Sequence, residues 1–349
     1  MTCYNTDPQA CQCRARACTK VEINLHNGLS LRKSQCLISE IVRIFPPTSV
    51  DWSPIGVGTR IGYISDVPGS KQGLDFIRST FQQCTVSHEK CQKQTTTLPS
   101  RLLFIGSNSK PIKIVLPNPS NQIRYAALSH CWGKPRKLKW GKSRTLKLKR
   151  NNMAKLMNEI GWNSLPQTYQ DAITVCRALN IDYLWIDSLF IVQDDKEDWA
   201  YEASRMADVY GDAVIVIGAS STRHPNESFL SKRDNWRCEP HIIAWDDSTK
   251  ASPLLYARVG SHLGRHRAPL YGQQYDPLER RAWAFQEFRL AKRCLNFSSD
   301  EIQWFCKEGQ ICECSPTWEP WDPLELSLRH TSLAREHETQ FALSSNLPI

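Results

Sequence analysis

The stretch YLWIDSLFIVQDD, residues 183–195, joins a short apolar run to three acidic residues. The run begins at Ile181 as IDYLWI, a pattern typical of a β-strand that is buried on both faces of a sheet. In an open α/β sheet, ligands bind at the carboxyl ends of such strands. The sequence therefore predicts that Asp187, the first acid after the apolar run, lies at a ligand-binding edge.

Strands and helices alternate on both sides of this stretch. Strands are predicted at 124–130 and 213–218, and helices at 166–180 and 196–210. The resulting order, strand–helix–strand–helix–strand, favours an α/β fold with a parallel sheet flanked by helices. Two strand pairs joined by short polar turns are also predicted, RLLFIG with IKIVLP and RCLNF with EIQWF.

The composition is that of a globular chain, with 349 residues, 41% hydrophobic and 23% charged. No apolar run has the length of a membrane span, and the first residues lack the apolar segment of a secretory signal, so we expect a cytoplasmic protein. The net charge of +9 arises mainly from KPRKLKWGKSRTLKLKR, residues 134–150, which holds nine Lys or Arg and no acid. A solvated basic loop and a phosphate-binding loop both fit it; without base-reading elements, a nucleic-acid partner is not expected.

Fourteen cysteines in a chain without an export signal are expected to be thiols or metal ligands rather than disulfides. Two groups have spacings that zinc could use if the fold brought them together: Cys84-x3-His88-x2-Cys91 and Cys306-x5-Cys312-x-Cys314. Neither spacing is a standard zinc knuckle, and buried small thiols explain both equally simply. The sequence therefore assigns no metal site.

Three blocks of sequence resemble the fungal heterokaryon-incompatibility (HET) domain family. They are YAALSHCWG (125–133), LPQTYQDAITVCRALNIDYLWIDSLFIVQDDKEDWAYEASRMADVYGDAVIVIGASS (165–221) and RAWAFQE (281–287). With flanking segments, the resemblance covers about residues 75–315. We expect an irregular N-terminal region at 1–75, the HET domain with its flanks at 76–315 around a core at 120–235, and a C-terminal tail at 316–349.

The resemblance implies nonself recognition, with the domain triggering programmed cell death when incompatible hyphae fuse. It also implies a fold related to TIR domains, some of which hydrolyse NAD with a glutamate, so the core is expected to be flavodoxin- or TIR-like. The chain departs from the family at Phe190, where Cys is usual, and at Ala282, where Gly is usual. It also ends at Ile349, where family members continue into a further helical region, as a truncated copy would.

Two carboxylates are the candidate catalytic groups, Asp187 and Glu202. Glu202 borders the predicted apolar stripe of the 196–210 helix, which includes Trp199, and a partly desolvated carboxylate there has a raised pKa unless a cation pairs with it. In glycosidic cleavage of NAD, either carboxylate would stabilise an oxocarbenium-like centre or hold ribose hydroxyls. The simpler alternatives are an Arg205–Glu202 ion pair and a loop or helix cap at Asp187. Glu227 is a weaker third candidate.

Ser129, Trp132, Gly133 and Asp194 are the candidate ligand-binding residues, since they follow the predicted strands and would line the crevice beside Asp187. Trp132 fits a stacking role on a ligand ring and ordinary packing equally well. The neighbours of Ser129 in SHCWG, a histidine and a cysteine, point to opposite faces of a strand and cannot pair as a nucleophile and its base. No G-x-G-x-x-G loop accompanies the strands, which argues against an ordinary Rossmann oxidoreductase.

These features lead to an incompatibility effector as the expected function, with NAD hydrolysis as the mechanism and NAD as substrate rather than cofactor. The alternative is a non-catalytic module that acts by homotypic assembly or through an incompatibility partner protein. A crevice lined by Ser129, Asp187 and Glu202 would favour the enzyme, whereas Glu202 tied to Arg205 on a closed surface would favour the module. A nucleic-acid binder, resting only on residues 134–150, would show steeply salt-dependent binding.

Overall fold

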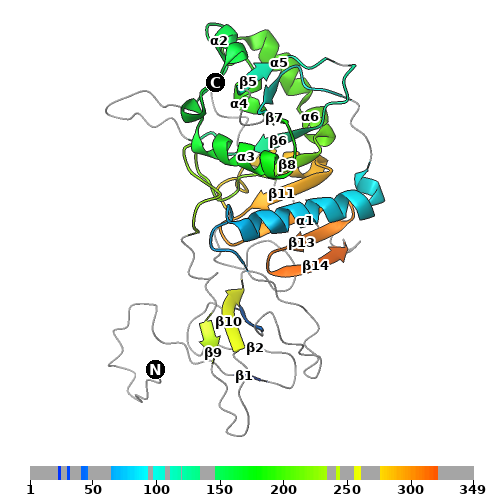
Figure 1. Ribbon diagram of the computed structural model, residues 1–349, viewed down its shortest axis with the longest axis vertical. Helices are drawn as coiled ribbons and strands as arrows, with labels where there is room; N and C mark the ends of the chain where they lie inside the picture. The colour runs from blue at the N-terminus through cyan, green and yellow to red at the C-terminus, as the bar shows by residue number, and fades with distance from the viewer. Residues whose placement is uncertain are drawn as a thin grey trace, which may run out of the picture. The chain divides into compact units, whose positions relative to one another are not determined.

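The computed structural model describes 23–24, 30–31, 41–45, 64–92, 97–106, 111–118, 120–133, 146–233, 241–243, 255–260 and 276–320. Most of the basic segment 134–150, the C-terminal tail from 321 onward and most of residues 1–63 therefore lie outside the described residues. The chain divides into two compact units (Figure 1). The first combines Met1–Gly58 with Glu239–Gln274, and the second combines Thr59–Cys238 with Tyr275–Ile349.

The first unit contains two small antiparallel sheets. One pairs β1 (Ile23–Asn24) with β2 (Ser30–Leu31). The other has the order β3-β10-β9, whose strands are Ile41–Phe45, Leu255–Gly260 and His241–Ile243. The sequence carries no visible signal for this pairing of the N-terminal residues with the segment near 255.

The second unit is built on a nine-stranded sheet with the order β14-β13-β12-β11-β8-β6-β7-β4-β5. At its centre β11, β8, β6 and β7 run parallel; they are Arg293–Phe297, Ile215–Gly218, Tyr125–Ser129 and Tyr183–Ile186. Antiparallel strands extend both sides of this centre: β12 (Ile302–Cys306), β13 (Gly309–Cys312) and β14 (Ser315–Pro320) on one, β4 (Leu102–Phe104) and β5 (Lys113–Val115) on the other.

The prediction of an α/β fold is confirmed, and the predicted strands at 124–130, 181–186 and 213–218 form the parallel centre. The sheet as a whole departs from the prediction, because five of its strand pairs are antiparallel and three are parallel. A flavodoxin- or TIR-like core is therefore not confirmed. The physical reason lies in the consecutive strands β4–β5 and β11–β12–β13–β14, whose connections lack a crossover helix and so allow only antiparallel pairing, which extends the sheet beyond its parallel centre.

Helices cover the sheet in the second unit (Figure 1). They are α1 (Lys71–Ser87), α2 (Met153–Asn158), α3 (Gln167–Ala178), α4 (Asp187–Phe190), α5 (Lys196–Ser204), α6 (Met206–Asp212) and α7 (Ala282–Leu290), with 3₁₀ turns η2 (Glu89–Cys91) and η3 (Trp162–Ser164). Within the described residues, none of the helices has the length and apolar character needed to cross a bilayer.

The single helix predicted over 196–210 is broken in two. Asp195 caps the first part, since its carboxylate accepts hydrogen bonds from the backbone N–H groups of Glu197 and Asp198. At Arg205 the backbone departs from ideal helical angles (φ −100°, ψ −1°), and α6 begins at the next residue. The predicted apolar stripe is not the buried face of α5, since Trp199 is 57% exposed whereas Glu202 is 1% exposed.

The core lies around the parallel strands. Every residue of β6 is buried, as expected for a strand with neighbours on both sides and helices above and below. Gly218 ends β8 where other groups approach closely, since a Cβ there would lie 2.6 Å from Cζ of Phe288 and 2.9 Å from Oδ1 of Asn296. The strand ends are therefore tightly packed against α7 and β11.

Candidate functional site

The carboxyl ends of the parallel strands meet at one edge of the sheet. Ser129, the last residue of β6, lies opposite Gly218 of β8, and Gly218 lies opposite Asn296 of β11. On the other side, Leu128 pairs with Ile186, so Asp187 follows directly on the same edge. The carboxyl ends of β6, β7 and β11 thus bring the polar side chains of Ser129, Asp187 and Asn296 to one edge of the sheet.

Asp187 is held at this edge by two hydrogen bonds. Its Oδ2 accepts from Nε1 of Trp132 at 2.7 Å, and its Oδ1 accepts from the backbone N–H of Ser188 at 2.7 Å. The side chain keeps 13% of its surface exposed, so the carboxylate is fixed in direction without being sealed from a ligand. Asp187 and Trp132 were both predicted at the crevice, and the structure brings them into contact.

His130 lies between this carboxylate and two buried hydroxyl groups, those of Tyr169 and Ser188. Its Nε2 lies 3.2 Å from Oη of Tyr169, which in turn lies 2.6 Å from Oγ of Ser188. Its Nδ1 lies 3.8 Å from Oδ1 of Asp187, too far for a hydrogen bond. Burial lowers the pKa of His130 despite the nearby charge of Asp187, so the imidazole is neutral at pH 7.

Cys131 follows His130 in the turn after β6. Burial raises the pKa of its thiol, although Arg281 opposes the shift. Arg281 also donates from Nη1 to the backbone carbonyl oxygen of His130 at 2.6 Å, which fixes the turn. That the adjacent histidine and cysteine do not act as a pair stays a prediction.

Glu287 of α7 is the functional candidate that sequence analysis missed. Ser129 donates a short hydrogen bond from Oγ to Oε2 of Glu287. Burial raises the pKa of Glu287 to about 7, the charge of Asp187 adds to this, and the Ser129 hydrogen bond and Arg281 oppose it. A carboxyl that is half protonated near neutral pH is suited to accepting and donating protons.

The sequence block RAWAFQE carries a signal for Glu287. It supplies the N-cap and most of α7, and its Trp283 is 60% exposed, so burial of this aromatic side chain is not its role. The block instead delivers its two charged ends, Arg281 and Glu287, to the turn after β6 and to Ser129. A charged residue at each end of a short block with few other polar groups was the available clue.

Gly133 has a structural reason for being glycine. Its φ is +75°, in the left-handed region, and a Cβ would lie 2.6 Å from Cβ of His224. This turn places the partly buried indole of Trp132 against Asp187, with Nζ of Lys147 5.0 Å from the ring centroid. Trp132 is thus oriented by a carboxylate, a lysine and a glycine turn together.

A family model described as "Heterokaryon incompatibility protein (HET)" matches residues 125–287. This segment is a HET domain. The match begins at the first residue of β6 and ends at Glu287. It therefore spans the group that we call the strand-end cluster: Ser129, His130, Trp132, Asp187 and Glu287. It connects the chain with fungal heterokaryon incompatibility. No curated protein and no solved structure matches the chain.

Asp194 and Asp195, the last two acids of the stretch 183–195, lie outside the strand-end cluster. Asp194 is exposed, and its Oδ1 accepts from the backbone N–H of Arg150 at 3.0 Å. Asp195 caps α5 and pairs with Nη2 of Arg150 at 2.7 Å. Of the three acids, only Asp187 contacts Trp132, and the ligand-binding role of Asp194 stays a prediction.

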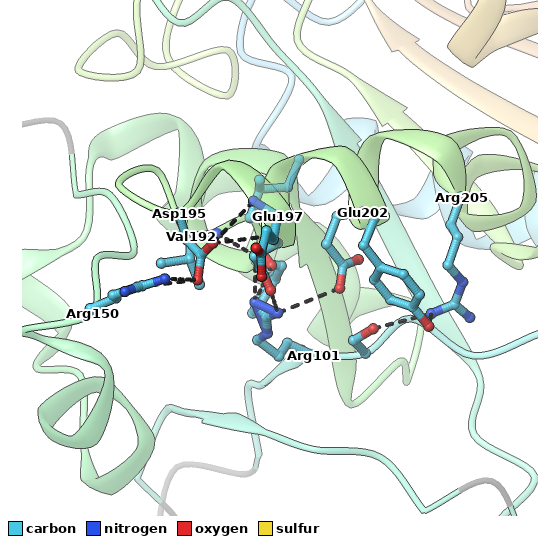
Figure 2. Close-up of polar contacts among 12 residues, drawn as sticks. Arg101, Arg150, Val192, Asp195, Glu197, Glu202 and Arg205 are labelled. Carbon is cyan, nitrogen blue, oxygen red and sulfur yellow. Dashed lines mark hydrogen bonds and ion pairs between the residues drawn. The ribbon is translucent and has the colours of Figure 1, made fainter.

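Glu202 lies in a separate ion cluster of the HET domain, shown in Figure 2. It is 1% exposed, and Nη2 of Arg101 lies 3.5 Å from its Oε1. The same arginine pairs with Asp198 and donates from Nη1 to the carbonyl oxygen of Phe190 at 2.9 Å. Glu202 therefore pairs with Arg101 and not with Arg205, the cation expected from the sequence. A catalytic role for Glu202 stays a prediction.

Arg205 turns away from Glu202 toward a different segment (Figure 2). It donates to Oγ of Ser100 at 3.1 Å and to the carbonyl oxygen of Leu98 at 2.9 Å. Glu227, the third candidate carboxylate, accepts from the backbone N–H of Arg223 at 2.6 Å and lies 3.1 Å from Nε2 of His224. Arg205 thus contacts the segment at 98–100, and Glu227 contacts the loop at 223–224.

The cysteine groups are arranged differently from their sequence spacing. Cys306 was grouped by spacing with Cys312 and Cys314, but it lies beside Cys84, His88 and Cys91. The four ligand atoms of this group all lie within 4.8 Å of one another. Cys312 and Cys314 lie instead with Glu301. A ligand set that includes Cys306 could not be recognised from spacing, since more than 200 residues separate it from the others.

Proposed function

We propose that this HET domain is an effector of heterokaryon incompatibility, which triggers programmed cell death after contact with nonself cytoplasm. The observation that supports it as an active effector is the strand-end cluster, defined as Ser129, His130, Trp132, Asp187 and Glu287. Two acids come together there: Trp132 fixes Asp187, and burial raises the pKa of Glu287 to about 7, with the charge of Asp187 adding to the rise. Such pairs are typical of hydrolytic sites.

The proposed reaction is hydrolysis of NAD. Asp187 would hold the ribose hydroxyls of the nicotinamide riboside and stabilise the positive charge that develops at the anomeric carbon. The bond from that carbon to the nicotinamide nitrogen breaks, and nicotinamide leaves as a neutral molecule. Water adds to the anomeric carbon, and Glu287 accepts the proton that the water loses. The products are nicotinamide, ADP-ribose and one proton, and no cofactor is required.

Glu202 is the other carboxylate proposed for this reaction. Its carboxylate is 1% exposed, and Nη2 of Arg101 already lies 3.5 Å from its Oε1, so a ligand has little access to it. Asp187 and Glu287 are therefore the better supported pair. Substituting all three carboxylates separately will assign the role.

Assembly without catalysis is the second candidate function. Large aromatic side chains stand exposed on two helices of the HET domain: Trp199 and Tyr201 on α5, and Trp283 on α7. Aromatic residues are enriched in protein–protein interfaces, so these helices offer surfaces for self-association or for an incompatibility partner. On this alternative the strand-end cluster would only stabilise the fold.

The two functions predict different behaviour in yeast cells that express the chain. We expect cell death with loss of cellular NAD for the wild type, and survival with normal NAD for Asp187→Asn and Glu287→Gln at equal protein level. Asp75→Asn is the matched control, because Asp75 is exposed on α1 outside the cluster, and it should kill like the wild type. Death without NAD loss in all four proteins would reject hydrolysis and favour assembly.

A further inference from the structure

Four potential metal ligands converge outside the strand-end cluster. Cys84 lies in α1, His88 follows its last residue, Cys91 lies in η2 and Cys306 ends β12. Their three sulfur atoms and the imidazole nitrogen all lie within 4.8 Å of one another. We propose that these residues bind one Zn²⁺ ion as a structural Cys₃His site.

The geometry suits a tetrahedral ion. A Zn–S bond of about 2.3 Å places two ligands of a tetrahedron about 3.8 Å apart, within the span of this group. Nδ1 of His88 already lies 3.2 Å from Sγ of Cys306, so little movement is needed to place both on a common ion. Three thiolates and an imidazole fill the four positions, which is the closed coordination of a structural zinc site.

Neighbouring groups orient and balance the ligands. Nε of Arg293 donates to Sγ of Cys84 at 3.3 Å, and its positive charge would offset the excess negative charge of three thiolates around a divalent ion. Trp318 of β14 packs edge-on against His88, with the ring centroids 4.4 Å apart. Such second contacts are characteristic of metal sites and hold the ligands in place.

Isolated buried thiols do not account for this group. Cys176 on α3 is an example of a simple core thiol, since it is fully buried and burial alone raises its pKa. The proposed site gathers three sulfur atoms around an imidazole from segments far apart in sequence. A disulfide would use two of the sulfurs and leave the histidine and the third thiol without a role.

The zinc ion would link the segments that precede and follow the HET domain in the sequence. Three ligands precede the matched segment 125–287 and the fourth follows it, so the metal would join α1 and η2 to the β12–β13 hairpin. The backbone N–H of Lys90 already donates to Oε1 of Glu308 in that hairpin at 2.7 Å. The ion would thus fasten the two flanks of the domain to each other.

Elemental analysis of the purified full chain tests the site. We expect the wild type to hold about one zinc equivalent more than Cys91→Ala, because removing one ligand of a structural site releases the ion. Cys176→Ala, which also shortens a buried cysteine, should keep the zinc content of the wild type. His88→Ala should lose the ion and His88→Cys should retain it, since four thiolates also bind zinc.

A second measurement needs no variant and covers the case in which the substituted chains fail to fold. Replacing zinc by Co²⁺ in the wild type should give the intense visible absorption of a tetrahedral cobalt–thiolate site. A wild type that holds no zinc and gives no cobalt spectrum would overturn the proposal. Equal zinc in wild type and Cys91→Ala, or a disulfide among the three cysteines in the purified chain, would overturn it as well.

Discussion

Arg101→Met should lower the free energy of unfolding by about 3–5 kcal/mol, because it removes the counter-charge of a buried ion cluster. Glu202 is 1% exposed, and Asp198 also pairs with Arg101. Methionine keeps much of the arginine side-chain volume, so the loss arises from two carboxylates left without their cation. Urea unfolding monitored by tryptophan fluorescence measures the change.

Arg150→Met is the matched control for this prediction. Arg150 also pairs with an aspartate near the start of α5, but its side chain is 69% exposed, so water replaces the lost contact. We expect little measurable change in its unfolding midpoint. If the two substitutions had equal effects, Glu202 would not depend on Arg101, and its assignment to a structural ion cluster would be wrong.

Glu287→Gln should flatten the dependence of stability on pH. Burial raises the pKa of Glu287 in the folded state to about 7 from an ordinary value of 4.5, so the folded state binds this proton more tightly than the unfolded state. The contribution is therefore complete below about pH 4.5 and is lost as the pH rises through about 7. Its full size is about 3 kcal/mol, from about 1.4 kcal/mol for each pKa unit.

Unfolding free energies measured from pH 4.5 to 8 will test this sign. The wild type should lose more stability across the range than Glu287→Gln, whose amide can still accept the hydrogen bond from Ser129. Burial also raises the pKa of Glu279 to about 7, so this residue adds to the slope of both proteins, and the difference between the profiles isolates Glu287. Parallel profiles would show that Glu287 is ionised in the folded protein.

Local patterns predicted the centre of the fold. The apolar runs ending at Ser129, Ile186 and Gly218 specify buried parallel strands, because only such strands are covered on both faces. The break at Arg205 was missed, since each half of the 196–210 segment has acceptable helical spacing. At the break, Arg205 contacts Ser100, a residue distant in sequence. The spacing of apolar residues within one segment cannot predict such a contact.

The candidate site was predicted only in part for the same reason. Asp187, Ser129 and Trp132 follow strand ends, so parallel topology alone brings them to one edge. Glu287 comes from α7, within the long connection between the parallel strands β8 and β11, and Arg101 reaches Glu202 from about a hundred residues away. Pairings of this kind depend on how the elements pack, which the amino-acid pattern of each element does not specify.

The most direct test of the strand-end cluster is incubation of the purified full chain with NAD, with nicotinamide release and ADP-ribose binding measured together. The account predicts release by the wild type, and a loss of about 100-fold or more in Asp187→Asn and Glu287→Gln, since each removes a group that acts in the transition state. Asp75→Asn, at an exposed position of α1, should match the wild type. Two results would contradict the assignment of this cluster as the site of NAD hydrolysis. One is a wild type that neither releases nicotinamide nor binds ADP-ribose, and the other is an equal rate in all four proteins.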